Sequence, residues 1–247
     1  MIKKMILWIL SIFDHFYQKK WIKFLKKNNY NRFNFLIDIG AHRGESIKLF
    51  SKNFIINKII SFEASPINFI HLRKEIEKNK QAFNVTEIIL ENIALGAKDK
   101  VVEFKQFDES SSSTIKKVDE NSNYYKRKFK LINFFNNKKT YKTLQIKIHT
   151  LKDYIEKNTI EKIDFMKIDT EGYEFEILLG LENKIQLVDI IMFEHHYDNM
   201  IKKGYTFEDI NSLLIKNNFN KIYKSRMPFR KTFEYIYKRE EKLIEKN

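Results

Sequence analysis

The chain has no cysteine among its 247 residues, and it has only 2 prolines and 6 glycines. The absence of cysteine excludes disulfide bonds, thiolate metal sites and a cysteine nucleophile, and it fits a reducing cytosol. The apolar run at residues 5–13 is far shorter than the roughly 20 residues that a membrane span requires. No small-residue cleavage site follows this run, which argues against a secretion signal. The sequence therefore predicts a cytoplasmic protein.

Negative charge is scarce relative to positive charge. The chain has 46 Lys and Arg against 32 Asp and Glu, a net charge of +14. A polyanionic partner such as nucleic acid or an anionic membrane would explain this excess. The lysines are spread along the chain, however, and the composition also fits A/T-rich codon usage. Residues 1–32 place lysines between apolar residues and predict an amphipathic helical extension. This extension either packs on the core or contacts the inner face of the membrane.

Two of the few glycines lie close together after a short apolar segment. Residues 35–39 predict a buried strand that is interrupted by Asp38, and Gly40 and Gly44 bracket the following turn. Glycine removes the Cβ that would keep a ligand away from the backbone. The helix expected from Glu45 would direct its free N–H groups at the same turn. This pattern predicts a site for a nucleoside cofactor.

Strand-like and helix-like segments alternate along the rest of the chain. Further strands are expected at residues 58–63, 86–92, 100–107, 141–148, 162–169, 188–193, 220–225 and 233–238. Helices are expected near residues 66–80, 151–158, 173–180 and 206–217. This alternation predicts an α/β fold, with a parallel sheet covered by helices on both faces. We assign the fold to one domain over residues 33–247, with an insert at 119–140, after the extension at 1–32.

Polar residues follow the expected strands, where ligands of a doubly wound sheet bind. They are Asp38, Glu63, Asn92, Asp169, and Glu194 with His195. An acid after the second strand typically binds ribose hydroxyls, a role that suits Glu63. The turn at residues 40–44 lacks the middle glycine of the NAD fingerprint G-x-G-x-x-G. S-adenosylmethionine has no phosphate, and its ammonium and sulfonium groups suit Asp38. The pattern therefore favours S-adenosylmethionine over NAD.

Five segments together resemble the FkbM-type methyltransferases. They are residues 38–46 (DIGAHRGES), 61–66 (SFEASP), 92–96 (NIALG), 163–174 (IDFMKIDTEGYE) and 191–194 (IMFE). The K-I-D-x-E-G-x-E part of the fourth segment is the most specific. Two positions depart from the family pattern: His42 stands where the family often has Asn, and Ala64 replaces the first proline of E-P-x-P.

The resemblance implies a Rossmann-like class I methyltransferase with a mostly parallel seven-stranded sheet and an antiparallel closing strand. It implies S-adenosyl-L-methionine as the cofactor and O-methylation of a sugar or other natural-product hydroxyl. The residues that it assigns to cofactor binding are Asp38, Gly40, Ala41, His42, Gly44, Glu63, Ala64 and Asn92. Of these, Asp38 and Gly40 would hold the methionine part, Glu63 the ribose and Asn92 the adenine.

Methyl transfer to a hydroxyl also requires a group that takes the hydroxyl proton. The candidates are Asp169, Glu194, His195 and His196. Histidine is best matched to neutral pH, so we expect His195 or His196 to be the base, with Asp169 in support. Asp169, Glu194 and His195 could instead hold a divalent metal. Because these residues lack a diagnostic spacing, we predict no metal site.

Two other functions fit parts of the sequence. The net charge and the basic segment 126–130 (KRKFK) would suit a nucleic-acid methyltransferase or a nucleic-acid or membrane-surface binding module. The N/D-P-P-Y loop typical of amino-directed base methyltransferases is absent, because the only prolines are Pro66 and Pro228. We therefore expect a sugar acceptor, such as a cell-surface or capsular glycan. The insert and the chain after Glu194 are the expected sites of acceptor selection.

Overall fold

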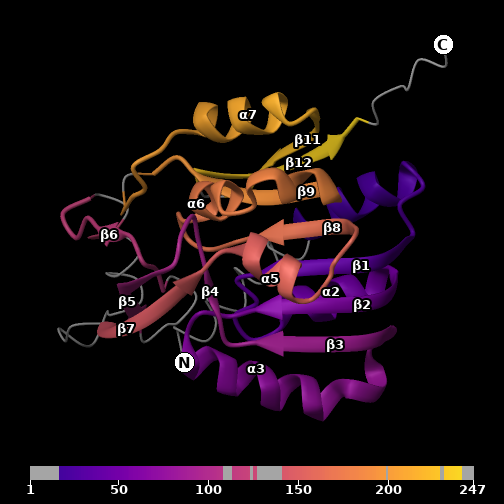
Figure 1. The fold of residues 1–247 in the computed structure, drawn as a ribbon, viewed down its shortest axis with the longest axis horizontal. Coiled ribbons are helices and arrows are strands. Elements are labelled where there is room, and N and C mark those ends of the chain that lie inside the picture. Colours follow the sequence, from indigo (N-terminus) through magenta and orange to yellow (C-terminus); the bar gives the residue numbers. More distant parts are fainter. Residues whose placement is uncertain are drawn as a thin grey trace.

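Seven strands form the central sheet of the computed structural model, which describes residues 17–107, 113–122, 125–126, 141–198, 200–228 and 231–240. They are β1 (Arg32–Ile39), β2 (Ile55–Phe62), β3 (Val85–Glu91), β8 (Ile163–Ile168), β9 (Val188–His196), β11 (Phe219–Arg226) and β12 (Thr232–Arg239). Their order across the sheet is β11-β12-β9-β8-β1-β2-β3 (Figure 1). The strands from β3 to β9 are parallel, and β12 runs antiparallel between β9 and β11. The predicted mostly parallel seven-stranded sheet with an antiparallel strand is confirmed.

Helices cover both faces of this sheet. They are α2 (Glu45–Asn53), α3 (Pro66–Asn79), α5 (Leu151–Lys157), α6 (Glu174–Leu179) and α7 (Phe207–Lys216), with short 3₁₀ turns at Lys80–Ala82 and Glu182–Leu187. Residues of α2 and α3 belong to one apolar cluster, and residues of α5, α6 and α7 belong to another. The sequence signals at two helix starts are confirmed, since Pro66 opens α3 and Thr206 with Asp209 forms a capping box before α7.

The N-terminal helix, described over residues 17–27, packs on the face of the sheet that carries α2 and α3. Its buried side chains recur at helical spacing, and Trp21 is only 1% exposed. The Trp21 ring lies 5.3 Å from the ring of Phe50 and 6.4 Å from that of Phe54. The apolar side of this helix is therefore part of the core. No helix within the described ranges is long and apolar enough to cross a membrane.

A second, smaller sheet lies beyond the carboxyl ends of the parallel strands (Figure 1). It contains β4 (Ala94–Leu95), β5 (Lys100–Phe107) and β7 (Tyr141–His149), in the order β4-β7-β5. A two-residue ladder nearby joins β6 (Lys117–Val118) to β10 (Ile201–Lys202). The alternating segments at residues 100–107 and 141–148 predicted the two long strands. The three two-residue strands were not predicted, and most of the predicted insert at 119–140 lies outside the described residues.

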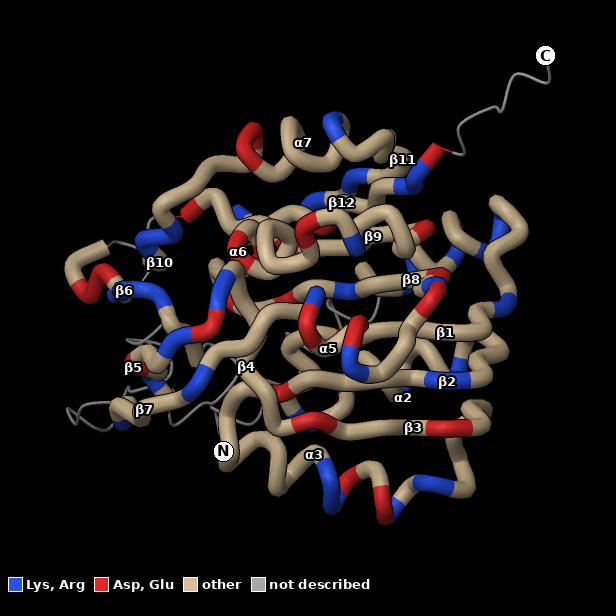
Figure 2. Tube along the Cα trace, viewed as in Figure 1, with Lys and Arg blue, Asp and Glu red and all other residues tan. Residues whose placement is uncertain are grey.

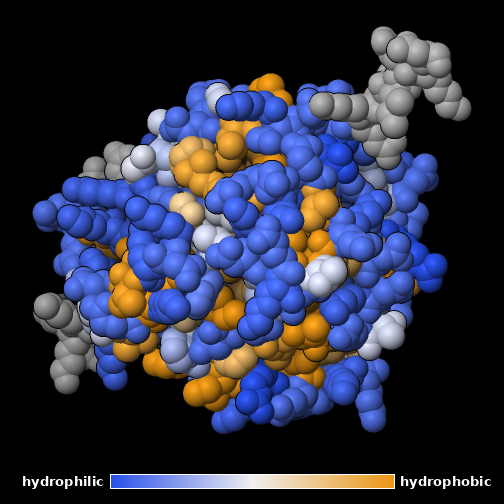
Figure 3. Space-filling view, viewed as in Figure 1, coloured by the Kyte–Doolittle hydropathy of each residue, from blue (hydrophilic) through white to orange (hydrophobic). Residues whose placement is uncertain are grey.

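Positively and negatively charged residues are distributed along most elements of the fold (Figure 2). The face drawn in Figure 3 is mostly hydrophilic, with smaller apolar areas between the hydrophilic ones. This distribution agrees with the sequence, in which the lysines are spread rather than clustered.

Candidate active site

The glycine turn after β1 is shaped by contacts within the protein. Gly40 has φ +85°, and a Cβ added to it would lie 1.8 Å from the carbonyl oxygen of Asp169. The backbone N–H groups of Gly40 and Ala41 donate to the carbonyl of Phe62 at 2.9 and 3.0 Å. Gly44 has φ +88° and lies against Leu72 of α3. The two glycines therefore allow the ends of β1, β2 and β8 to pack together. Neither of them carries a side chain that would keep a ligand away from the backbone of the turn.

Asp38, at the end of β1, is a buried carboxylate without a conventional partner. It is 0% exposed, and neither carboxylate oxygen has a hydrogen-bond partner within the described structure. Its nearest cation is Lys167, whose Nζ lies 3.7 Å from Oδ1. Burial raises the pKa of Asp38, and the Lys167 charge only partly opposes this effect. A buried carboxylate of this kind suits an ammonium group that brings its own N–H donors.

Glu63 follows β2 and is held in a fixed orientation. It is 6% exposed, and its two carboxylate oxygens accept from the backbone N–H of His42 at 2.7 Å and of Ser65 at 2.8 Å. Burial raises the pKa of Glu63 to about 7, against the lowering effect of the two N–H donors. Each oxygen keeps a second lone pair, so the carboxylate can still accept from hydroxyls. Its neighbour Ala64 packs partly buried against the core.

Two further predicted cofactor residues hold the loops around Glu63. The Asn92 side chain donates to the carbonyl oxygen of Glu63 at 2.7 Å, so it ties the end of β3 to the end of β2. His42 adopts a left-handed backbone with φ +49°, a conformation that Asn also tolerates. Its Nδ1 lies 3.2 Å from Glu45. Burial tends to lower the pKa of His42, and Glu45 raises it by more. The structure thus brings the predicted cofactor residues to one edge of the sheet.

Lys167 links the cofactor side of the site to Asp169, although the sequence analysis did not single it out. Its Nζ lies 3.1 Å from Asp169 and 3.7 Å from Asp38. Burial would lower the pKa of Lys167, but the two acids outweigh it and raise the pKa. Lys167 lies two residues before Asp169, so the alternation of a strand places both on one face. A lysine directly after the apolar pair Phe165-Met166 of β8 was the signal in the sequence.

β9 extends through His196, so its last residues alternate between the two faces of the sheet. Glu194 and His196 lie on the same face of β9 as Met192, the face that packs with α2 and α3. His195 lies on the opposite face, with Phe193, among aromatic rings. The centre of its ring is 4.8 Å from that of Tyr197. Burial lowers the pKa of His195 to about 3. The structure therefore brings Asp169, Glu194 and His196 to one face and leaves His195 on the other.

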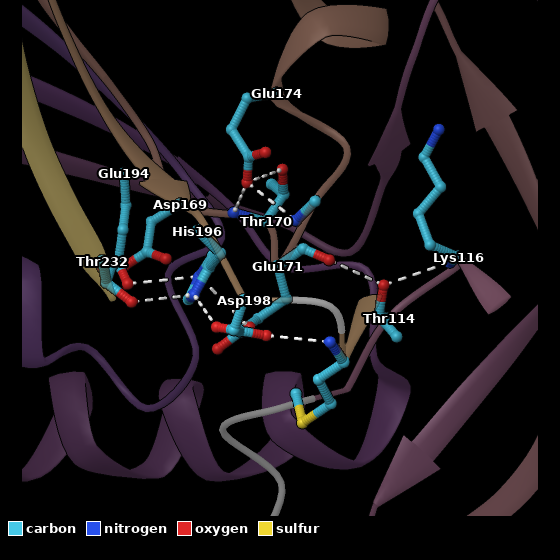
Figure 4. A network of polar contacts seen from close by, with 12 residues as sticks. Thr114, Lys116, Asp169, Thr170, Glu171, Glu174, Glu194, His196, Asp198 and Thr232 are labelled. Carbon is cyan, nitrogen blue, oxygen red and sulfur yellow. Dashed lines mark hydrogen bonds and ion pairs between the residues drawn. The ribbon is translucent and has the colours of Figure 1, made fainter. Parts of the chain in front are cut away.

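Carboxylates surround the imidazole of His196 (Figure 4). Its Nε2 lies 3.2 Å from Glu194 and 3.4 Å from Glu171. Its Nδ1 lies 3.0 Å from the Thr232 hydroxyl and 3.7 Å from Asp198. Sequence reasoning missed Glu171, Asp198 and Thr232. Both Asp198 and Thr232 lie outside the recognised motifs. Asp198 follows His196 by two residues, and the pairing of β12 with β9 brings Thr232 opposite His196.

The turn after β8 presents Glu171 to this cluster. Glu171 has φ +53°, and its carbonyl oxygen accepts from the Thr114 hydroxyl at 2.8 Å. The buried carboxylate of Glu174 accepts from the backbone N–H of Thr170 at 3.1 Å and of Gly172 at 3.0 Å. Glu174 therefore fixes the turn, and Thr114 fixes it from the smaller sheet (Figure 4). Among the described residues, no group of three or more His, Asp or Glu side chains could hold a metal ion.

The chain resembles known methyltransferases in sequence and in fold. It matches the methyltransferase FkbM domain over residues 38–223. It is 20% identical over 163 residues to Methyltransferase 1 of Beauveria bassiana (strain ARSEF 2860), which covers 65% of this chain and 64% of that protein. The chain thus spans about two thirds of the length of this curated relative.

Two solved structures share the fold. The FkbM methyltransferase of Methylobacillus flagellatus KT superposes with a TM-score of 0.53 and 15% identity, covering 83% of this chain and 43% of that one. The magnesium protoporphyrin IX methyltransferase of Synechocystis PCC 6803, crystallised with bound S-adenosylmethionine, gives a TM-score of 0.52 and 8% identity, covering 93% and 81%. The predicted fold class is confirmed. Because the family match over residues 38–223 covers most of the chain, the chain belongs to the FkbM family of S-adenosylmethionine-dependent methyltransferases.

Proposed function

We propose that this protein transfers a methyl group from S-adenosylmethionine to a hydroxyl of a sugar, in a cell-surface or capsular glycan. The observation that supports this most is the buried carboxylate of Asp38, which lacks a hydrogen-bond partner within the described structure. It lies at the carboxyl edge of the sheet, one strand away from the oriented carboxylate of Glu63. This pair fits a ligand with an ammonium group at one end and ribose hydroxyls at the other.

On the donor side, Asp38 would hold the ammonium group and Glu63 the ribose hydroxyls, with Asn92 at the adenine. When bound, the cofactor supplies a methyl group on a sulfonium centre. The protein's own contribution is alignment of the acceptor oxygen with that methyl group. Such alignment can remove about 7–11 kcal/mol of the barrier, provided that the reacting atoms are held in near-attack geometry.

On the acceptor side, the unneutralised side chains are carboxylates rather than amines or guanidinium groups. Asp169, Glu171 and Glu194 lie beside the cofactor edge, and the nearby cations Lys167 and His196 are already paired with them. Carboxylates accept hydrogen bonds from sugar hydroxyls and repel phosphates. This charge pattern favours a neutral, hydroxyl-rich acceptor over a nucleic-acid backbone, despite the net charge of +14.

Thermal denaturation tests the donor site. We expect S-adenosylmethionine and S-adenosylhomocysteine to raise the melting temperature, and NAD and ATP to leave it unchanged. Asp38→Asn should abolish the shift, because the amide loses the charge that holds the ammonium group. Asp99→Asn is the matched control, since Asp99 is an exposed acid that pairs with Lys147 and His149 of β7, away from the candidate site. A folded protein that neither adenosyl compound stabilises would contradict the proposal.

Transfer of a labelled methyl group tests the acceptor. The protein is incubated with methyl-labelled S-adenosylmethionine and with separate glycan and RNA fractions of a cell extract. We expect the label in the glycan fraction, resistant to nuclease and to mild base, as an ether would be. Nuclease-sensitive label would instead favour a nucleic-acid methyltransferase.

A further inference from the structure

We propose that His196 is held as a fixed cation and that Glu194 takes the proton of the acceptor hydroxyl. This inference deepens the proposed function and rests on it. It replaces the sequence-based expectation that one of the two neighbouring histidines is the base.

The geometry around His196 leaves its ring no role as a proton acceptor. Nε2 lies between the carboxylates of Glu194, at 3.2 Å, and Glu171, at 3.4 Å. Neither contact is an aligned hydrogen bond, but a protonated Nε2 is attracted to both carboxylates, whereas its lone pair would be repelled by them. Nδ1 faces a third carboxylate, Asp198, at 3.7 Å, and the hydroxyl of Thr232, which can donate or accept, at 3.0 Å. Carboxylates on both sides of the ring therefore favour the doubly protonated imidazolium.

The charges that face His196 from each neighbouring element are mostly negative. Those that act on His196 itself are Glu171 and Glu174 from the turn after β8 and the start of α6, Glu194 from β9, and Asp198 from the loop after β9. Asp169 from the end of β8 and Glu234 from β12 act on its partner Glu194. The nearby cations are Lys167, which pairs with Asp169, and Lys203, whose ammonium donates to the His196 carbonyl. Burial would lower the pKa of His196, but the surrounding acids raise it to about 10.

Glu194 has the properties that a base requires in this position. It is buried on the same face as Asp38 and Asp169, at the carboxyl edge where the cofactor and the acceptor meet. Burial and the neighbouring acids raise its pKa well above the usual range, and the His196 charge opposes this effect. The His196 charge thus favours the ionised carboxylate, while burial and the surrounding acids keep its proton affinity high. Asp169 is a weaker candidate because its carboxylate is already bound to Lys167.

The transfer step balances with these groups alone. The acceptor oxygen forms a bond to the methyl carbon, and the bond between that carbon and sulfur breaks with its electron pair left on sulfur. The O–H bond of the acceptor breaks, and its proton passes to the carboxylate of Glu194. The proton then leaves to water. His196 stays protonated throughout and is a positioning residue that acts through Glu194.

Nitrogen NMR of the histidine side chains tests the charge of His196 without an acceptor. With uniformly ¹⁵N-labelled protein, the signals of His196 are identified by their loss in His196→Gln. We expect an imidazolium pattern, with both nitrogens protonated, from pH 6 to pH 8.5. We expect His195 to show a neutral ring over the same range, because burial lowers its pKa to about 3. A neutral His196 ring at pH 7 would overturn the proposal and restore histidine as the base.

Carbon NMR of the glutamate carboxyls tests the coupling to Glu194. An opposite charge within about 4–6 Å lowers a carboxyl pKa by about one to three units. His196→Gln should therefore raise the titration midpoint of Glu194 by about that much. His195→Gln is the matched control, because its ring lies on the opposite face and should leave the midpoint unchanged. Equal midpoints in wild type and His196→Gln would contradict the positioning role.

Binding of S-adenosylhomocysteine separates this inference from the proposed function. We expect Glu194→Gln and His196→Gln to retain the thermal shift with S-adenosylhomocysteine, because neither residue lies on the donor side. Methyl transfer should then fail in Glu194→Gln. Retained transfer in a folded Glu194→Gln protein would refute the role of Glu194 while leaving the donor site intact.

Discussion

Gly40 is the residue on which the arrangement of the three strand ends depends. Its left-handed backbone and its approach to the Asp169 carbonyl occur at the same position, so a side chain there is both strained and obstructed. The sequence predicted a glycine that admits a ligand. The structure adds that the protein itself fills the space where a Cβ would lie.

Gly40→Ala should therefore destabilise the fold severely. The Cβ would lie 1.8 Å from a backbone oxygen, which cannot rotate away as a side chain could. We expect a loss of about 3 kcal/mol or more in the free energy of unfolding, measured by urea denaturation. Gly204→Ala is the control: Gly204 also has a positive φ of +79°, but it has nothing within 4 Å of the added Cβ. That variant should lose only about 1 kcal/mol, and equal losses would refute the steric explanation.

Glu63 should make the stability of the ligand-free protein depend on pH. Its pKa is raised from 4.5 to about 7 on folding, so the folded state binds more protons than the unfolded state between these values. The stabilising effect of protonation is complete below about pH 4.5 and is lost as the pH rises through 7. Relative to Glu63→Gln, wild type should lose up to about 3 kcal/mol across this window. Parallel pH profiles of unfolding in the two proteins would contradict this expectation.

Individual residues of the site could be predicted from the sequence where they lie at the end of an apolar strand or within a recognised motif. Asp38, Glu63 and Glu194 follow or end apolar strands, and the structure brings them to one edge of the sheet. Lys167 and Glu171 lie within the recognised motif, but their partners come from other strands, so their roles depend on pairing in three dimensions. The separation of His195 from His196 depended on where β9 ends. The sequence pattern ended this strand at Phe193, before the two histidines.

Whole elements were predicted more reliably than their ends. The sequence analysis located the strands of the central sheet, because each is a run of apolar or alternating residues bounded by polar ones. It missed β4, β6 and β10, since two residues are too few to show a period. It assigned residues 1–32 to an extension that either packs on the core or contacts the membrane, and the described helix contributes Trp21 and Leu25 to the core.

Trp21→Ala should therefore destabilise the whole domain. The indole ring is 1% exposed and contacts the rings of Phe50 and Phe54, so its loss leaves a cavity beside β1 and α2. Large aromatic truncations of this kind cost about 3–5 kcal/mol. Lys23→Ala, on the exposed side of the same helix, should change stability by less than about 0.5 kcal/mol. If Trp21→Ala unfolds at the wild-type urea midpoint, the helix is an extension rather than part of the core.

For the molecule as a whole, the net charge of +14 contrasts with the acidic candidate site. The helix at residues 17–27 carries five lysines and no acid, and its apolar side is turned to the core. The side that carries the exposed Lys20, Lys23 and Lys27 is therefore the one that could meet a surface. Such a side favours electrostatic contact with anionic lipids, at about 1 kcal/mol per lysine near the membrane, without insertion.

Binding to lipid vesicles tests whether these lysines attract the protein to an anionic membrane. We expect retention on vesicles that contain phosphatidylglycerol, little retention on phosphatidylcholine alone, and weakening with added salt. Reversing Lys20, Lys23 and Lys27 to Glu should abolish retention and leave the thermal shift with S-adenosylhomocysteine unchanged. The control reverses the exposed residues Lys74, Lys98 and Lys142, which changes the net charge equally but on separate elements. If both triple variants lose retention to the same degree, the total charge matters and the helix does not.

The short ladder between β6 and β10 has a consequence for engineering. It joins residues 117–118, which precede β7, to residues 201–202, which follow β9, and the N–H of Asp119 also donates to the Met200 carbonyl at 2.7 Å. Thr114, three residues before the first of these segments, donates to the carbonyl of Glu171 in the turn beside the candidate base. A chimera that takes only one of the two segments from a relative would pair a foreign strand with a native one, and the two need not match in sequence. Successful exchange of acceptor preference between family members should therefore require transplanting both segments as one unit.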